Sequence, residues 1–219
     1  MGLRDISLKE EYRSDRDDIV SEFFIPCLSK CIEYDRFIEY ISLKSLTTLS
    51  LGFDNFKKNK AKLRIICGHR FNASDLEFIT KLFAKDSRNF PLKVDRIIDS
   101  KMKMLQDIVD NHQIEIKIAI PNSEEVVGSF SERVGIFIDE HDDIVAFTGT
   151  SNQTFDSQNR NFESVDVFTS WNDKSRVGTK VKDFEDLWEN KTKYVEVYDF
   201  KYAEENHMLK YASQWAIDI

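Results

Sequence analysis

Four side chains in the second half of this 219-residue chain have types that suit phosphate chemistry. Arg133 carries a guanidinium fork that matches phosphate oxygens, and the side-chain amide of Asn152 can donate to such an oxygen. Ser131 lies two residues before Arg133, but its hydroxyl is a poor nucleophile unless a base lies within hydrogen-bond reach. Glu163 follows and can contact Ser131 or form a salt bridge. These residue types predict a phosphate-binding site.

A β-hairpin is expected to bring these residues together. Residues 134–138 form an apolar run with strand character, residues 139–143 are turn-forming, and residues 144–148 return as the second arm. Arg133 and the loop that begins at Gly149 then lie at the same end of the hairpin. Glycine at that position lets the backbone approach a phosphate closely.

Several of these residues also have a purely structural interpretation. Asn152 can bond its own loop backbone, Arg133 can be an exposed arginine at a strand start, and Asp139 can serve turn chemistry. His141 lies in the hairpin turn, at the end opposite Arg133, so it cannot easily supply an imidazole to Ser131. His69 directly follows an expected strand and could line a cleft at its carboxyl end.

The rest of the chain alternates predicted helices and strands and then adds a run of strands. Because buried β-branched strands need cover on both faces, we predict an α/β fold with a mixed, mainly β-sheet core covered by helices, in one domain. We divide the chain into an N-terminal arm (1–14), the domain (15–200), and a C-terminal helix or start of a linker to a further domain (201–219). The predicted helices are 15–33, kinked near Pro26, then 43–56, one ending at 83 and capped by Asn72 or Ser74, 91–109, 182–188 and 202–219; the strands are 36–42, 62–67, 114–120, 134–138, 144–148, 164–168 and 194–198.

Composition restricts the class of protein. The net charge of −8 lacks the basic excess of most nucleic-acid-binding proteins, so any DNA-binding face must be local. The densest basic run, residues 57–64, is more typical of a solvated loop. Cys27, Cys31 and Cys67 lack metal-ligand spacing and are interpreted as small buried hydrophobes. No apolar segment approaches the ~20 residues of a membrane span and no signal peptide is evident, so we expect a cytoplasmic location and no membrane partner.

The order of the candidate site residues resembles the motif of the phospholipase D superfamily. That motif runs His-x-Lys, a short strand, an Asp, Gly-Ser-x-Asn and, in the nuclease branch, a later Glu. Here Ser131 stands at the histidine position and Arg133 at the lysine position. Asp139 falls one position later than the family's aspartate. The remaining matches are Gly149, Thr150 in place of serine, Asn152 and Glu163.

The resemblance extends over residues 15–200. Residues 34–42 resemble the Tyr-Asp-x-x-Ser-Gly-Tyr-Phe-Ser strand of phospholipase-D-like domains fused to restriction-type helicases, with Glu39 in place of the glycine. Residues 63–68, 168–171 and 184–188 also fit. The ordered set makes the resemblance more specific than any one of these patterns.

The resemblance implies a metal-independent DNA phosphodiesterase, a restriction-type nuclease of an antiphage system, with no cofactor and no metal. In that family one motif's histidine becomes phosphorylated, a second copy's histidine protonates the leaving group, and the glutamate orients a histidine. It assigns Ser131, Arg133, Asn152 and Glu163 to the catalytic positions, and Arg133, Gly149, Thr150 and Asn152 to phosphate binding. Because Ser131 lacks the imidazole, this chain is expected to be impaired or inactive.

The implied partners are DNA, a second copy of the chain and a helicase domain or subunit. A single motif copy provides half a site, so a homodimer with the site beside its two-fold axis is expected. The alternative is a non-catalytic module that binds nucleic acid or mediates dimerisation for a larger helicase-containing defence protein. The chain reaches Ile219 without a polar tail, which favours more protein beyond it.

Overall fold

The computed structural model describes residues 2–41, 56, 58–83, 105–122, 128–149 and 162–211. Eight strands form one mixed sheet in the order β1-β8-β7-β6-β2-β3-β5-β9. The central β2, β3 and β5 are parallel, and every other neighbouring pair is antiparallel. The strands are β1 Glu11–Arg13, β2 Glu33–Ile38, β3 Lys62–Gly68, β5 Ile114–Pro121, β6 Val134–Ile138, β7 Ile144–Gly149, β8 Ser164–Thr169 and β9 Val195–Asp199.

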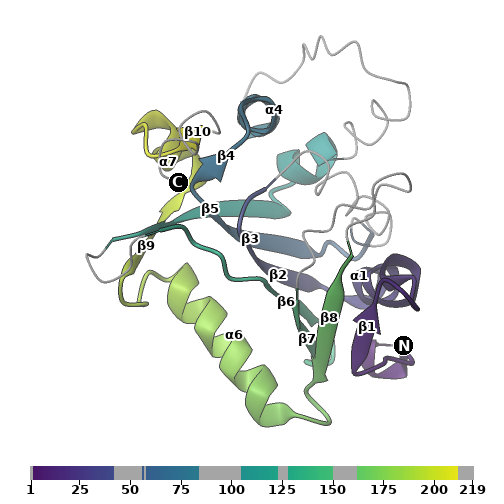
Figure 1. The fold of residues 1–219 in the computed structure, drawn as a ribbon. Coiled ribbons are helices and arrows are strands. Elements are labelled where there is room, and N and C mark those ends of the chain that lie inside the picture. The colour runs from purple at the N-terminus through teal and green to yellow at the C-terminus, as the bar shows by residue number, and fades with distance from the viewer. Residues whose placement is uncertain are drawn as a thin grey trace.

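Helices cover both faces of this sheet (Figure 1). On one face α6 buries Val177, Phe184 and Leu187 against β2, β3 and β6. The opposite face packs against the N-terminal segment and α4, through a larger apolar cluster. Since both faces are apolar and covered, the mixed, helix-covered α/β sheet predicted from the sequence is confirmed. The helical elements are η1 Leu3–Asp5, η2 Val20–Phe24, α1 Ile25–Lys30, α4 Ala73–Phe83, α6 Lys174–Trp188 and α7 Phe200–Glu205.

The predicted hairpin that carries the candidate site is confirmed. Strands β6 and β7 pair antiparallel, with Val134 opposite Thr148 and Ile138 opposite Ile144. Residues 139–143 form the connection, at the end of the hairpin opposite Arg133. The alternation of turn-forming and apolar residues was therefore sufficient to locate this pair of strands.

The first long helix is shorter and less regular than predicted. Its first turn, η2, is π-helical, and α1 then continues with Pro26 in its first helical turn. Pro26 has no backbone N–H to donate within this continuous helical segment, and the change from π to α geometry falls next to it. The predicted strand 36–42 is shifted as well, because β2 spans Glu33–Ile38.

The predicted helix over 202–219 is confirmed only for residues 202–205 and is wrong for the described residues 206–211. Helix α7 ends at Glu205, and His207 adopts a φ of 56°, a left-handed conformation that stops the helix. The chain then forms β10, Lys210–Tyr211, which pairs in parallel with β4, Arg70–Phe71. Helix α6 is also longer than the predicted 182–188, because Asp173 caps it at its first turn by accepting from the Arg176 amide.

Other predicted elements agree with the structure or lie outside it. Strands β3, β5, β8 and β9 and helix α4 match their predicted positions closely, and the Asn72 side chain accepts from the Ser74 amide at the start of α4. Residues 105–110 are helical, as predicted for the end of the 91–109 helix. Most of the predicted helices 43–56 and 91–109 lies outside the described residues. None of the described helices has both the length and the apolar composition needed to cross a membrane.

Candidate functional site

One end of the sheet gathers the sequence-predicted residues that the structure describes. Arg133 directly precedes β6, Gly149 ends β7, and Glu163 directly precedes β8. The registers place Val134 opposite Thr148, and Gly149 opposite Val165, so these three positions lie at the same end of neighbouring strands. Thr150 and Asn152 lie outside the described residues.

Arg133 forms an ion pair with Glu39, which immediately follows β2. Their side chains are 30% and 33% exposed, respectively, so the pair faces solvent. The Nε atom of Arg133 is buried and has no hydrogen-bond partner among the described residues. Arg133 therefore has one terminal nitrogen held by a carboxylate and one buried donor without a partner among the described residues.

Ser131 is exposed and lies two residues before this arginine. No hydrogen bond or ion pair among the described residues involves its side chain. A serine hydroxyl needs a base within hydrogen-bond reach to attack phosphorus. The described part of the structure supplies no such base to Ser131.

Glu163 is held in place by the N-terminal segment. Its backbone amide donates to the Ser14 hydroxyl at 2.9 Å, and its carbonyl accepts from the Ser14 amide at 3.0 Å. The Glu163 side chain is only 5% exposed. The segment before η2 thus extends the β1–β8 pairing and fixes the backbone of one candidate site residue.

A buried arginine that the sequence analysis did not single out lies beside Glu163 and Arg133. Arg36, in β2, is 2% exposed, and the Glu163 carboxylate and Arg133 guanidinium both affect its titration. Burial lowers the pKa of Arg36, the negative charge of Glu163 opposes that shift, and the positive charge of Arg133 adds to it. The site end of the sheet therefore contains two arginines and two carboxylates.

The row of residues beside Arg36 explains how its guanidinium is accommodated. Arg36 is opposite Gly135 in β6, and Gly135 is opposite Phe147 in β7. The guanidinium carbon lies 4.6 Å from the centre of the Phe147 ring, a cation–π arrangement. An arginine inside the apolar run 34–38, together with a glycine in the apolar run 134–138, is the sequence signal that could have identified this contact.

Gly149 has a packing role in addition to the predicted role at phosphate. Its φ is 155°, a conformation that favours glycine, and a Cβ atom there would lie 2.1 Å from the Ser164 carbonyl oxygen. The close approach of β7 to β8 therefore requires glycine. Backbone contact between this loop and phosphate stays a prediction.

Asp139 lies at the far end of the hairpin and is fully buried. Its carboxylate accepts from the backbone amides of Leu3 at 2.7 Å, His141 at 2.9 Å and Asp143 at 3.0 Å. These bonds close the turn and attach the N-terminal segment to it. The structural interpretation of Asp139 fits this geometry, and His141 lies at the end away from Arg133.

His69 follows the last residue of β3 and is 5% exposed. Its imidazole forms a hydrogen bond with the backbone of Ala119, and Nδ1 has no partner among the described residues. Burial lowers the pKa of His69, and the positive charges of Lys210 and Arg70 add to the effect. The side chain thus packs toward β5, which lies on the side of β3 away from β6.

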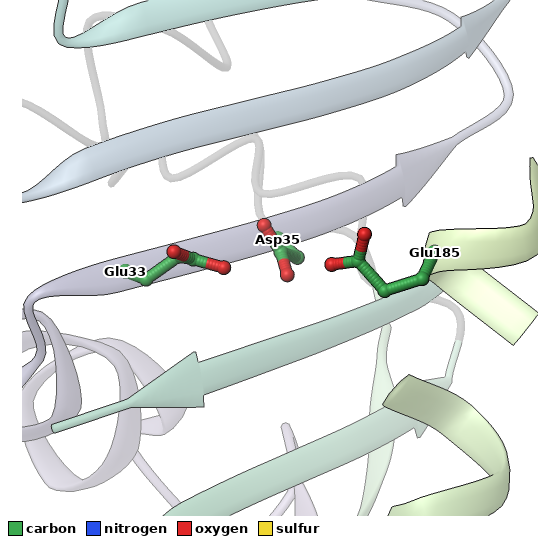
Figure 2. Close-up of side chains that lie close together, drawn as sticks. All are labelled: Glu33, Asp35 and Glu185. Atoms are coloured by element: carbon green, nitrogen blue, oxygen red, sulfur yellow. The ribbon is translucent and has the colours of Figure 1, made fainter. Parts of the chain in front are cut away.

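A second cluster of carboxylates lies on the α6 face of the sheet. Figure 2 shows Glu33 and Asp35 on β2 and Glu185 on α6. One carboxylate oxygen from each residue lies within 4.8 Å of the other two. Arg64 donates to all three carboxylates, at 2.6 to 2.7 Å. Its guanidinium also lies 4.8 Å from the centre of the Phe184 ring. We interpret this cluster as an arginine-centred contact that attaches α6 to the sheet rather than as a metal site.

A cavity of about 660 Å³ opens away from the candidate site, at the other end of β8. Its wall includes Asp166 and Thr169 of β8 and Arg176 of α6. None of the residues that line it is Ser131, Arg133 or Glu163. The cavity and the candidate site are therefore separate features.

No family model matches this sequence, and no curated protein matches it. The fold is similar to that of NucT from Helicobacter pylori, at 10% sequence identity over 86% of this chain and 97% of that one, with a TM-score of 0.51. Yeast tyrosyl-DNA phosphodiesterase is also matched, at 10% identity over 72% of this chain, with a TM-score of 0.37. This chain spans 31% of the yeast protein.

Proposed function

We propose that this chain, which has the predicted phospholipase-D-like fold, binds the phosphodiester backbone of DNA at the sheet end that carries Arg133, Gly149 and Glu163. We further propose that its metal-independent hydrolytic step is disabled at Ser131. The observation that carries this proposal is the convergence of those positions on neighbouring strands, in the order that the motif resemblance predicts. DNA is proposed as the ligand because the sequence resemblance is to the nuclease branch of the family.

Phosphodiester cleavage without a metal needs a nucleophile, a proton donor for the leaving oxygen and cations around the equatorial oxygens. Arg133 supplies a cation, and Asn152 is proposed to supply an amide donor. Ser131 supplies a hydroxyl to which the described residues give no base. The chain therefore retains groups that can bind phosphate, whereas Ser131, at the position of the nucleophile, has no base to activate it in the described part of the structure.

A gain-of-function substitution tests the proposed cause of inactivity. Ser131→His, alone and combined with Arg133→Lys, is incubated with supercoiled plasmid in EDTA between pH 5 and 8, a range that spans imidazole titration. We expect nicking by the histidine variants and none by the wild type. Ser175→His, which adds an imidazole at an exposed position of α6, is the matched control. Absence of nicking by every Ser131 variant would contradict the proposal of a disabled nuclease.

A second candidate function is a non-catalytic DNA-binding module, and the unactivated Ser131 together with the solvent-facing Arg133 favours it. This function predicts binding that weakens with salt and produces no cleavage. Arg133→Ala should weaken binding of a labelled duplex and reduce the salt slope by about one unit. Arg176→Ala, an exposed arginine on α6, is the charge-matched control. Unchanged binding after Arg133→Ala would exclude a phosphate-holding role.

We also propose a homodimer, because one chain provides one motif copy and a doubly charged transition state needs paired donors. Sedimentation in moderate salt should give the mass of two chains. A monomer at all concentrations tested would contradict a shared site. Association with a helicase and a role in antiphage defence follow from the sequence resemblance and are proposed on that basis alone.

A further inference from the structure

Glu39 holds one terminal nitrogen, Nη2, of the Arg133 guanidinium, a donor that a phosphate could also use. It follows the last residue of β2, and its carboxylate forms the ion pair with Arg133 described above. Its backbone is fixed as well, because its carbonyl accepts from the Gly68 amide at 3.1 Å. The carboxylate is thus presented to Arg133 from a strand end whose position is set by the parallel pairing of β2 with β3.

Carboxylate and phosphate oxygens bind the same donors of an arginine, in the same planar geometry. A phosphate can therefore reach the donor of Arg133 held by Glu39 only by displacing that carboxylate. The exposed fractions of about one third show that the pair is open to solvent, where such exchange is possible. An exposed ion pair contributes little, so a competing anion of higher charge density can replace it.

The charges at this end of the sheet also favour replacement of the Glu39 carboxylate by a phosphate. Arg36 and Arg133 contribute two positive charges, and Glu39 and Glu163 contribute two negative charges. Glu163 is buried, whereas Glu39 is part-exposed, so Glu39 is the carboxylate that can leave. Its departure gives the cluster a net positive charge, which favours an anion.

We propose that Glu39 is an internal competitor for Arg133 and sets the affinity of this site for phosphodiesters. This inference rests on the proposed function. The carboxylate holds the guanidinium in the unbound protein and yields it to the backbone of DNA.

The test measures binding of a fluorescein-labelled DNA duplex by anisotropy at several salt concentrations, with the full chain throughout. Glu39→Gln keeps the shape of the side chain and removes its charge. Glu140→Gln is the matched control, because it makes the same charge change on an exposed residue in the turn at the opposite end of β6. Arg133→Ala and the Glu39→Gln/Arg133→Ala double variant complete a cycle. Circular dichroism confirms that each variant is folded.

We expect Glu39→Gln to strengthen binding about fivefold, the ratio that corresponds to a weak exposed ion pair. Glu140→Gln should change binding by much less, and Glu39→Gln should have no effect when Arg133 is already absent. This pattern would show that the competition acts through Arg133 and not through net charge.

Other outcomes separate this inference from the proposed function. If Arg133→Ala weakens binding and Glu39→Gln leaves it unchanged or weaker, Glu39 positions Arg133, and the competitor role is overturned while DNA binding stands. If Glu39→Gln and Glu140→Gln strengthen binding equally, the effect is general electrostatics, and the inference again fails alone. If no variant binds DNA, both the inference and the proposed function are overturned.

Discussion

The guanidinium of Arg36 in β2 extends across Gly135 in β6 to the ring of Phe147 in β7. These three residues lie opposite one another on neighbouring strands, and together they accommodate the buried positive charge of Arg36. The glycine makes this possible, because a Cβ at position 135 would lie 2.1 Å from Cε1 of Phe147 and 3.0 Å from Nη1 of Arg36. Gly135 thus has a steric role that connects β2, β6 and β7 just below the candidate site.

Gly135→Ala should therefore destabilise the fold. The added methyl group must displace the Phe147 ring or the buried guanidinium, and overpacking of this kind costs about 1–3 kcal/mol of unfolding free energy. Urea denaturation measures the change. Gly178→Ala in α6 is the control, since its Cβ meets no atom within 4 Å and alanine favours a helix. Equal stability of the Gly135→Ala variant and the wild type would contradict the proposed packing.

The charges of Arg36 and Glu163 should be energetically coupled. Arg36→Met removes a buried cation beside a buried carboxylate, and loss of one partner from such an arrangement costs about 3 kcal/mol or more. Adding Glu163→Gln should recover part of that loss. Urea denaturation of the two single variants and the double variant gives the coupling. Strict additivity would show that Glu163 does not act on Arg36.

Asp139→Ala should destabilise the protein without affecting DNA binding. The substitution leaves the amides of Leu3, His141 and Asp143 without their carboxylate acceptor; the Leu3 bond is buried, and a buried amide without a partner costs about 1–3 kcal/mol. Thermal unfolding measures the first effect and duplex anisotropy the second. A folded Asp139→Ala variant that has lost DNA binding would instead place Asp139 at the site.

Ionisation of Asp35 should lower the free energy of unfolding of the protein as pH rises. Burial raises the pKa of Asp35 to about 7, and the hydrogen bonds and positive charge of Arg64 only partly oppose it. Because the folded protein then holds this proton more tightly than the unfolded chain, the contribution is fully present below about pH 4 and is lost between about pH 4 and 7.

The measurement is the free energy of unfolding in urea at pH values across that window. Asp35→Asn, which cannot ionise, should lose less stability between pH 4 and 7 than the wild type loses. Lys182→Gln, which removes an exposed charge from the solvent face of α6, should leave the wild-type pH profile unchanged. Parallel profiles for wild type and Asp35→Asn would contradict the raised pKa.

Local sequence patterns were enough to predict the fold class, the β6–β7 hairpin and the order of the motif residues. Apolar runs separated by turn-forming residues define strands locally, so residues 134–138 and 144–148 could be placed without knowledge of the rest of the chain. The same reasoning failed over residues 206–211, where residues 206–207 end α7 and Lys210–Tyr211 pairs with β4. That pairing depends on a partner distant in sequence.

The charged side chains that meet at the candidate site are brought together by long-range packing. Arg36 and Glu39 lie close together in the chain but far from Arg133 and Glu163, and the register of β2 against β6 and the order β6-β7-β8 bring the four to one end of the sheet. Residue type indicated that Arg133 could bind phosphate, but its pairing with Glu39 and the burial of Arg36 beside Glu163 depend on long-range packing. The local periodicity of apolar residues predicts individual helices and strands. A network of charged side chains instead depends on how those strands pair.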